Sequence, residues 1–219
     1  MSLSEQINLQ YRKRENKESL YNAGYYTDYA QAEINKNIQY FLEKSFANFK
    51  NLSLLEIGAG TGQNAYIFES FGFQRSNISF NELLKERIEA IKSKFPDNKV
   101  YEGDATVVPI DKKFDVIFQS VVFTSILKQE DRVNLANRMW RLLNENGIIL
   151  WYDFIYNNPK NKDVRKVTAK EVKELFPQNS SMLLKKITLA PPIGRKVGKF
   201  YKLFNLPFLR SHILVVLKK

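Results

Sequence analysis

Apolar residues along this chain alternate between short continuous runs and longer stretches with helical spacing. The continuous runs lie at residues 54–57, 78–80, 100–102, 114–118 and 148–154. The helical patterns lie at residues 63–71, 83–95 and 132–143. Continuous apolar runs of this length are typical of strands that are covered on both faces, and helices between them form the crossovers of a parallel sheet. The alternation therefore predicts an α/β fold with a doubly wound, mostly parallel sheet.

Both ends of the chain extend this pattern. Residues 4–49 predict two helices, the second over residues 29–49 with Asp28 as its cap. Near the other end, residues 183–189 and 213–217 predict two closing antiparallel strands. We expect one domain over residues 1–219, divided into an N-terminal helical cap or lid (1–49), a cofactor-binding core (50–154) and a C-terminal part (155–219).

Three glycines end the first predicted strand abruptly. Gly58, Gly60 and Gly62 alternate with other residues, and a helical pattern begins directly after them. A dinucleotide-binding fingerprint would need its third glycine at position 63, where the chain has Gln63, and no Gly-Lys-Ser/Thr follows for a phosphate-binding loop. Glycine leaves the main chain open to a ligand and permits left-handed backbone angles. A cofactor bound against this turn is the prediction.

The pattern from Glu56 to Gly62 resembles the first motif of class I S-adenosylmethionine-dependent methyltransferases. Further resemblances follow in the family's order over residues 52–154. The resemblance implies a seven-stranded Rossmann-like sheet with an antiparallel last strand and N-terminal helices, and methyltransferase activity with S-adenosylmethionine as cofactor. It implies that Glu56 holds the cofactor's amino group. The implied cofactor-binding residues are Glu56, Gly58, Ala59, Gly60, Gly62, Glu82, Leu83, Asp104, Ala105 and Gln119.

Two of these carboxylates also have structural interpretations. Glu82 follows Gly62 by 20 residues, where an open parallel sheet places an acid for two ribose hydroxyls. The alternative is a carboxylate that interacts favourably with the N-terminus of the next helix. Family members more often have Asp here, after a hydrophobic residue instead of Asn81. By resemblance Asp104 accepts from the adenine amine, with a turn or cap residue as the alternative.

Residues for the chemical step are less clearly marked. Asp153, at the end of the fifth predicted strand, is the candidate general base, with a loop-capping role as the alternative. Methyl transfer asks mainly for positioning of the acceptor. Tyr25 and Tyr26 are interpreted either as a lid over the cofactor and acceptor or as packing for the second helix. The Asn-Pro-Pro-Tyr type of motif is absent after residue 118, which counts against adenine or glutamine nitrogens as acceptors.

Composition excludes several classes of site. The chain has 219 residues, 44% of them hydrophobic, and no cysteine, so disulfides and thiolate metal sites are excluded. His212 is the single histidine, so no metal site is expected, and it is interpreted as structural. The polar first 20 residues do not resemble a signal peptide, and no apolar run is long enough to span a membrane. These features predict a cytoplasmic enzyme.

The net charge of +11 is concentrated near the end of the chain. No acidic residue follows Glu174, whereas nine Lys and Arg residues do. Within this tail, residues 196–204 carry apolar and lysine residues at helical spacing, which predicts an amphipathic cationic helix. It could be a solvated helix, could contact a membrane surface that carries a lipid-linked substrate, or, a weaker alternative, could bind RNA.

The acceptor is the least constrained part of the prediction. Residues 157–171 and 189–192 resemble bacterial class I methyltransferases associated with surface-glycan or small-metabolite clusters. This resemblance implies methyl transfer to an oxygen or nitrogen of a small molecule or a glycan, which could be lipid-linked. The alternatives are an RNA-directed methyltransferase and a non-catalytic cofactor-binding module that associates with RNA or membrane.

Overall fold

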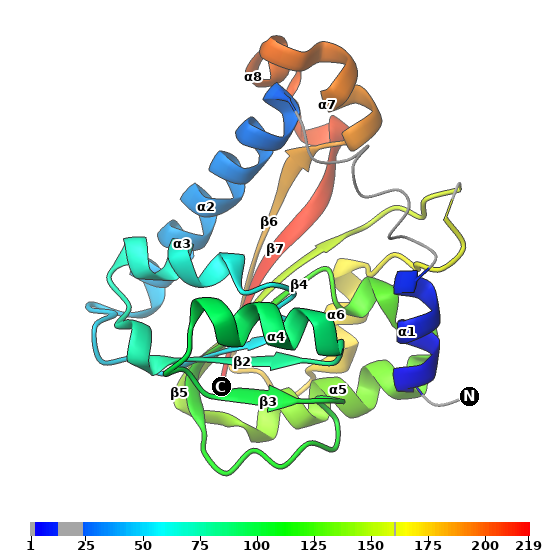
Figure 1. Ribbon diagram of the computed structural model, residues 1–219. Helices are drawn as coiled ribbons and strands as arrows, with labels where there is room; N and C mark the ends of the chain where they lie inside the picture. Colours follow the sequence, from blue (N-terminus) through cyan, green and yellow to red (C-terminus); the bar gives the residue numbers. More distant parts are fainter. Residues whose placement is uncertain (1–2, 13–23, 160) are drawn as a thin grey trace.

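The computed structural model describes residues 3–12, 24–159 and 161–219 and is built on a seven-stranded sheet (Figure 1). The strands are β1 (Leu54–Ile57), β2 (Ile78–Glu82), β3 (Val100–Glu102), β4 (Phe114–Ser120), β5 (Leu143–Phe154), β6 (Ser181–Leu189) and β7 (Arg210–Lys218). Their order is β3-β2-β1-β4-β5-β7-β6. β1 to β5 pair in parallel, and β7 is antiparallel to both β5 and β6. The predicted fold class is confirmed.

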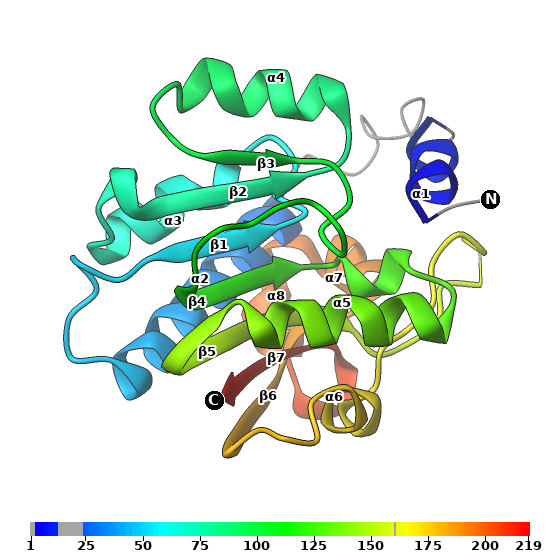
Figure 2. The same cartoon turned by 90° about the horizontal axis from the view of Figure 1, so that it is seen from below.

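Helices cover both faces of this sheet. The α-helices are α1 (Leu3–Arg12), α2 (Tyr25–Ser45), α3 (Gln63–Phe71), α4 (Lys85–Lys94), α5 (Gln129–Arg141), α6 (Ala169–Leu175), α7 (Pro191–Val197) and α8 (Tyr201–Phe204). Apolar residues of α2, α3 and α4 share one core cluster with the sheet, and those of α5 and α6 share another. Figure 2 shows α2 and α5 on opposite sides of the sheet. Every residue of β1 and β2 is buried as a result, including the polar Glu56, Asn81 and Glu82 near their carboxyl ends.

Helix ends agree with the sequence where a local cap sets them. Thr168 caps α6, and its side chain accepts a hydrogen bond from the Glu171 backbone N–H at 3.2 Å, which fits the Thr-x-x-Glu spacing of a capping box. The prediction for α2 is wrong at both ends, since the helix begins at Tyr25 after Gly24 and ends at Ser45. Asp28 therefore lies inside the first turn of α2. Its charge interacts favourably with the helix dipole there, but its side chain does not cap the helix.

The basic segment differs from the predicted single amphipathic helix. Gly198 has φ 50° and separates α7 from α8, with a 3₁₀ turn, η4 (Gly198–Phe200), between them. A second turn, η5 (Pro207–Leu209), leads into β7. We call residues 191–209 the cap, because they lie at the end of the molecule where α2 begins (Figure 1). Among the described residues, no helix has the length and apolarity needed to cross a lipid bilayer.

Candidate functional site

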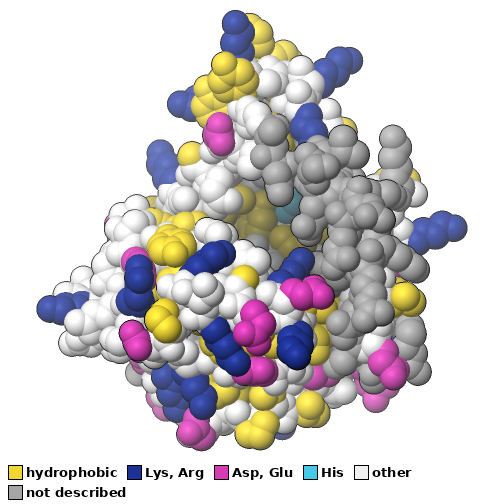
Figure 3. All heavy atoms as spheres, viewed as in Figure 1, with side chains coloured by type: hydrophobic (Ala, Val, Ile, Leu, Met, Phe, Trp, Pro, Cys, Tyr) yellow, Lys and Arg dark blue, Asp and Glu magenta, His cyan; other side chains and the backbone are white. Residues whose placement is uncertain are grey.

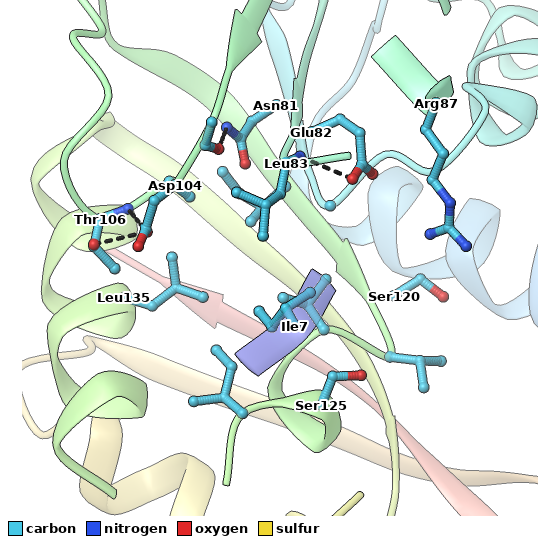
Figure 4. A pocket seen from close by; sticks show the side chains of 17 residues that line it. Ile7, Asn81, Glu82, Leu83, Arg87, Asp104, Thr106, Ser120, Ser125 and Leu135 are labelled. Carbon is cyan, nitrogen blue, oxygen red and sulfur yellow. Dashed lines mark hydrogen bonds between the residues drawn. The ribbon is translucent and has the colours of Figure 1, made fainter. Parts of the chain in front are cut away.

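A cavity of about 90 Å³ lies at the carboxyl ends of the parallel strands (Figure 4). Its walls come from the turns after β1, β2, β3 and β4 and from α1. The predicted cofactor residues that line it are Gly58, Glu82, Leu83, Asp104 and Ala105. Residues from three separate predicted motifs thus meet at one place, because parallel strands all end at the same edge of the sheet.

The glycine turn between β1 and α3 has a different requirement at each glycine. Gly58, Gly60 and Gly62 have φ values of 64°, 59° and 79°, which are strained for residues with a side chain. A Cβ on Gly58 would lie 2.6 Å from a methyl carbon of Val122, and a Cβ on Gly62 would lie 3.0 Å from the Phe95 ring. A Cβ on Gly60 would meet nothing within 4 Å. Packing therefore requires the outer two glycines, whereas open space adjoins the middle one.

Glu82 ties the tip of β2 to the glycine turn. Its Oε2 accepts a hydrogen bond from the Gly60 N–H at 2.7 Å, and its Oε1 accepts from the N–H groups of Leu83 and Leu84 at 2.8 and 2.9 Å. The side chain is buried yet lines the cavity. Three backbone donors fix the carboxylate in place, which is the pre-organisation that a ligand-binding acid needs. Both interpretations from the sequence, a ligand carboxylate and an acid near the start of α4, fit this position.

The turn after β3 is held by Asp104 and Asn81. Oδ1 of Asp104 accepts hydrogen bonds from the backbone N–H and the hydroxyl of Thr106, at 2.8 and 2.7 Å. The amide of Asn81 donates to the carbonyl oxygens of Tyr101 and Gly103, at 2.9 and 3.0 Å. Asp104 therefore stabilises a turn and lines the cavity at once. The tie made by Asn81 is not visible in the sequence, where this residue stands out only as a departure from the family pattern.

Glu56 lies beneath the glycine turn and does not line the cavity. Its Oε1 accepts a hydrogen bond from the Asn64 amide at 2.6 Å, and no described residue bonds its Oε2. Burial raises the pKa of Glu56 to about 8, and the charge of Glu82 adds to this effect, while the bond from Asn64 opposes it. A buried carboxylate oxygen without a partner is costly unless a cation or a donor can reach it.

Gln119 and Asp153 bond to each other at the ends of β4 and β5. Nε2 of Gln119 donates to Oδ2 of Asp153 at 3.0 Å, and Oε1 of Gln119 accepts from the Val122 N–H at 3.0 Å. Both side chains are fully buried and neither lines the cavity. Burial raises the pKa of Asp153 to about 7, and the hydrogen bond from Gln119 and the charge of Arg132 oppose this effect. Their contacts here are structural, and their roles in cofactor binding and catalysis stay predictions.

The end of β4 and the segment after it form a wall of the cavity that packs against the glycine turn. Ser120, Val121, Val122, Ser125 and Ile126 line the cavity. Val121 has φ 59°, a rare conformation for a β-branched residue, and its N–H donates to the Tyr152 carbonyl oxygen at 2.8 Å. Such strain is typical of functional segments that their surroundings hold in place. The sequence carries no signal of this strain.

A buried arginine holds this wall from behind. The guanidinium of Arg132 donates to the carbonyl oxygen of Ile126 at 2.8 Å and to those of Arg165 and Lys166 at 2.9 and 3.2 Å. It also pairs with Glu171 at 2.6 Å. Burial lowers the pKa of Arg132, and the pairing with Glu171 opposes the shift. One side chain thus links the cavity wall to the segment that precedes α6.

Helix α1 supplies the remaining side of the cavity through Ile7, which Figure 4 shows between the two walls. Tyr25 and Tyr26, the predicted lid residues, do not line the cavity. Tyr25 is exposed, and the Tyr26 hydroxyl donates to the Leu189 carbonyl oxygen at 3.2 Å, beside the cap. The contacts of Tyr26 agree with the packing interpretation, whereas exposed Tyr25 packs less, and the lid role of both residues stays a prediction. The sequence gives no indication that Ile7 reaches the cavity.

A hollow adjoins the cap on the face shown in Figure 3. The only histidine of the chain, His212, is visible in it beside hydrophobic side chains. Nδ1 of His212 lies 3.0 Å from the Ser211 hydroxyl, and its ring stacks on Tyr152 with centroids 5.0 Å apart. Burial lowers the pKa of His212 to about 4, so the ring is neutral at physiological pH. Within the described residues, no group of three His, Asp or Glu residues could hold a metal ion.

The sequence of the core matches the family model described as "Methyltransferase domain" over residues 55–151. A relative from Alkaliphilus oremlandii, described as an uncharacterized methyltransferase, is 31% identical over 108 residues. That match covers 49% of this chain and 48% of the relative, so the chain spans about half the length of the curated relative it matches.

The similarity to solved structures extends beyond residues 55–151. An S-adenosylmethionine-dependent methyltransferase from Archaeoglobus fulgidus superposes with a TM-score of 0.59 at 15% identity, covering 84% of this chain and 94% of the other. The glycopeptide N-methyltransferase MtfA in complex with S-adenosylmethionine gives a TM-score of 0.56 at 15% identity, covering 84% of this chain and 86% of the other. At these identities the likeness shows a shared fold.

Proposed function

The chain carries a methyltransferase domain of the class I fold, and from this we propose that the protein transfers a methyl group from S-adenosylmethionine to an oxygen or nitrogen of a small molecule or glycan. S-adenosylmethionine is the cofactor that the sequence resemblance to this family implied. The domain match supports the reaction type, and the position of the cavity at the strand ends supports the site.

The residues of the turn fit such a cofactor. Open space beside Gly60 leaves the main chain accessible to a ligand. Glu82 presents a fixed carboxylate in the cavity, suited to two adjacent hydroxyl groups. The unpaired Oε2 of Glu56 suits a buried ammonium group. We assign Glu82 to the ribose of the cofactor and Glu56 to its amino group. Asp104 and Ala105 are assigned to its adenine ring.

Bound S-adenosylmethionine supplies a methyl group on a positively charged sulfur, which is a strong electrophile. The protein then has to hold the acceptor in line and exclude water. The segment after β4, with its strained Val121 and the Arg132 support behind Ile126, provides a rigid wall for this purpose. Asp153, with a pKa of about 7, is the proposed residue that takes a proton from a hydroxyl or ammonium acceptor.

The observation that carries this proposal is the meeting of Gly58, Glu82, Asp104 and Ala105 around one cavity, in the order of the family's motifs. Calorimetry should detect binding of S-adenosylmethionine and of its demethylated product to the purified protein. Glu82→Gln should weaken binding at least tenfold, since a neutral amide is a poorer acceptor for two hydroxyls. The matched control is Glu102→Gln, on an exposed acid at the end of β3 that pairs with Lys92.

Catalysis needs a separate measurement. Protein incubated with methyl-labelled cofactor and a cell extract should transfer label to a small-molecule or glycan fraction. Label in RNA would identify the RNA-directed alternative. Binding of cofactor without any transfer would support the non-catalytic alternative, and absence of both binding and transfer would refute the proposed function.

A further inference from the structure

The cap is anchored to α2 through its inner side. Tyr201 is almost fully buried and stacks on Tyr29, with ring centroids 5.7 Å apart. Its hydroxyl donates to Glu33 at 2.7 Å and accepts from the Leu189 N–H at 3.0 Å. A Cβ on Gly194 would lie 2.1 Å from the Tyr26 ring, so α7 contacts this ring directly. The inner side of the cap is therefore already packed, and its other apolar residues are not needed for that contact.

The outer side of the cap exposes large apolar side chains. Leu203 is 71% exposed and Phe208 is 72% exposed. The exposed members of this set are Phe200, Leu203, Phe204, Leu206 and Phe208. Single exposed apolar residues are ordinary, but five of them within nine consecutive positions form a patch that indicates an interaction surface. We call these five residues the apolar tip.

Basic residues of the cap accompany the apolar tip. Arg195, Lys196, Lys199 and Lys202 are all exposed, and residues 175–219 contain no acid. Lys199 lies over the Phe200 ring, 5.4 Å from its centroid. On the neighbouring helix α2, the acid Glu33 accepts hydrogen bonds from the cap through Tyr201 and from Asn205. Figure 3 shows the hydrophobic and basic side chains together at this end of the molecule.

We propose that the cap docks on the surface of an anionic lipid bilayer, with the apolar tip in the interface and the lysines at the headgroups. Apolar side chains that enter the acyl boundary, flanked by cations at headgroup level, are the physical requirements for interfacial binding. Lysine stems can extend along the bilayer while their charges stay in water. RNA is the competing partner, because three of the five tip residues are phenylalanines on which bases could stack. Leu203 and Leu206 offer bases no ring, which favours the bilayer.

This surface is independent of the reaction in the cavity. One consequence does rest on the proposed function: a protein docked through the cap would meet a lipid-linked acceptor at the bilayer surface. Binding to lipid can be measured without cofactor or acceptor, so its failure is distinguishable from a failure of the methyl transfer.

The test is sedimentation of the full chain, without cofactor, with vesicles of phosphatidylcholine alone or with about one third phosphatidylserine. We expect binding to the anionic vesicles, weakened by high salt. The double variant Leu203→Ser/Phe208→Ser should bind at least tenfold more weakly. Its matched control is Val107→Ser, because Val107 is 77% exposed in the turn after β3 and should not affect binding. Thermal melts should be unchanged, since all three residues are exposed.

A variant that lacks two lysine charges tests the electrostatic contribution to lipid binding. Lys196→Gln/Lys199→Gln should reduce partitioning by roughly 25-fold, because each lysine near an anionic surface contributes about fivefold. Lys170→Gln, on an exposed lysine of α6, is the control. The proposal is overturned if the protein does not bind anionic vesicles, or if the loss of Leu203 and Phe208 leaves binding unchanged. Salt-sensitive binding to a single-stranded RNA oligonucleotide, with none to vesicles, would also overturn it.

Discussion

The ring of His212 lies parallel to that of Tyr152, with an interplanar angle of 4° and centroids 5.0 Å apart. The pair links β7 to β5 on the side of the sheet that faces the hollow. Tyr152 is also held by Thr188, whose hydroxyl lies 3.1 Å from the phenol oxygen. A neutral imidazole satisfies this packing, whereas a charged one would have to be solvated in the same place.

This stack predicts a loss of stability in mild acid. The pKa of His212 is lowered in the folded protein to about 4 from 6.5, so its contribution is complete above pH 6.5 and is lost as the pH falls toward 4. His212→Phe should remove this pH dependence of the stability, because phenylalanine keeps the stacking on Tyr152 and does not titrate. Thermal melts between pH 4 and pH 7 test it, and a wild-type slope that persists in the variant would contradict it.

Glu56 should show the opposite dependence on pH. Its folded pKa of about 8 lies above the ordinary value of 4.5, so its contribution to stability is complete below pH 4.5 and is lost as the pH rises through 8. Glu56→Gln should therefore stabilise the protein at pH 8 by a few kcal/mol, roughly, and have little effect near pH 4.5. The melts should be made without ligand. Equal effects at both pH values would argue against a buried, protonated acid.

Glu56→Gln should also weaken binding of the cofactor. If Oε2 of Glu56 receives the cofactor's ammonium group, that charge favours the carboxylate and lowers its pKa on binding. Calorimetry at pH 7 in buffers of different ionisation enthalpy should then detect a proton released by the wild type and none by Glu56→Gln. Affinity of the variant should fall by at least tenfold. Proton release that persists in the variant would assign it to another group.

Gly58 and Gly60 form a matched pair for separating folding from binding. Gly58→Ala should destabilise the protein by about 2–4 kcal/mol, since it adds a clash with Val122 to a positive φ. Gly60→Ala should cost only about 1–2 kcal/mol, because its Cβ enters open space. Cofactor affinity should fall at least tenfold in Gly60→Ala, where the new methyl group occupies the space proposed for the ligand.

Denaturant unfolding and calorimetry separate the two effects. Adding Val122→Ala to Gly58→Ala should recover the part of the stability that the clash removes, and leave the backbone strain. A Gly60→Ala protein that binds the cofactor as the wild type does would place the ligand elsewhere.

The parts of the site that sequence predicts are local in the chain. The glycine turn, Glu82 and Asp104 each follow a recognisable strand, so their meeting at one edge follows from the parallel sheet alone. Ile7 reaches the cavity from a helix that no short-range pattern connects to it, and the left-handed conformation of Val121 depends on its bond to Tyr152. Contacts between distant segments of this kind leave no periodic signal.

The sequence predicts one helix where the cap contains two, α7 and α8, and this difference has another cause. The spacing of apolar residues over 196–204 suits a helix, but Gly198 adopts φ 50° and the direct contact of Gly194 with Tyr26 fixes α7 separately. Tertiary contact therefore overrides the helical pattern, and Phe200 and Phe204 stay exposed.

Asp153 should control the dependence of the rate on pH. As the proposed base it must be ionised, so kcat should rise with pH through about 7, the pKa that burial gives this carboxyl. Asp153→Asn should lower kcat at least tenfold and remove that inflection, with cofactor affinity within twofold of the wild type. A variant that loses stability but keeps the pH profile of the wild type would leave Asp153 with its structural bond to Gln119 alone.

Helix α1 should control entry to the cavity. With Ile7 in place the cavity measures about 90 Å³, below the roughly 300–1,000 Å³ of pockets that hold ligands of this size. We predict that α1 moves when the cofactor enters, and weaker packing of Ile7 should make this movement easier. Ile7→Asp should accelerate cofactor association several-fold and dissociation as well, measured by surface plasmon resonance on immobilised protein. Leu9→Asp is the matched control, because Leu9 is an exposed residue of the same helix that does not line the cavity. If Ile7→Asp and Leu9→Asp both bind the cofactor at the wild-type rate, α1 does not limit entry.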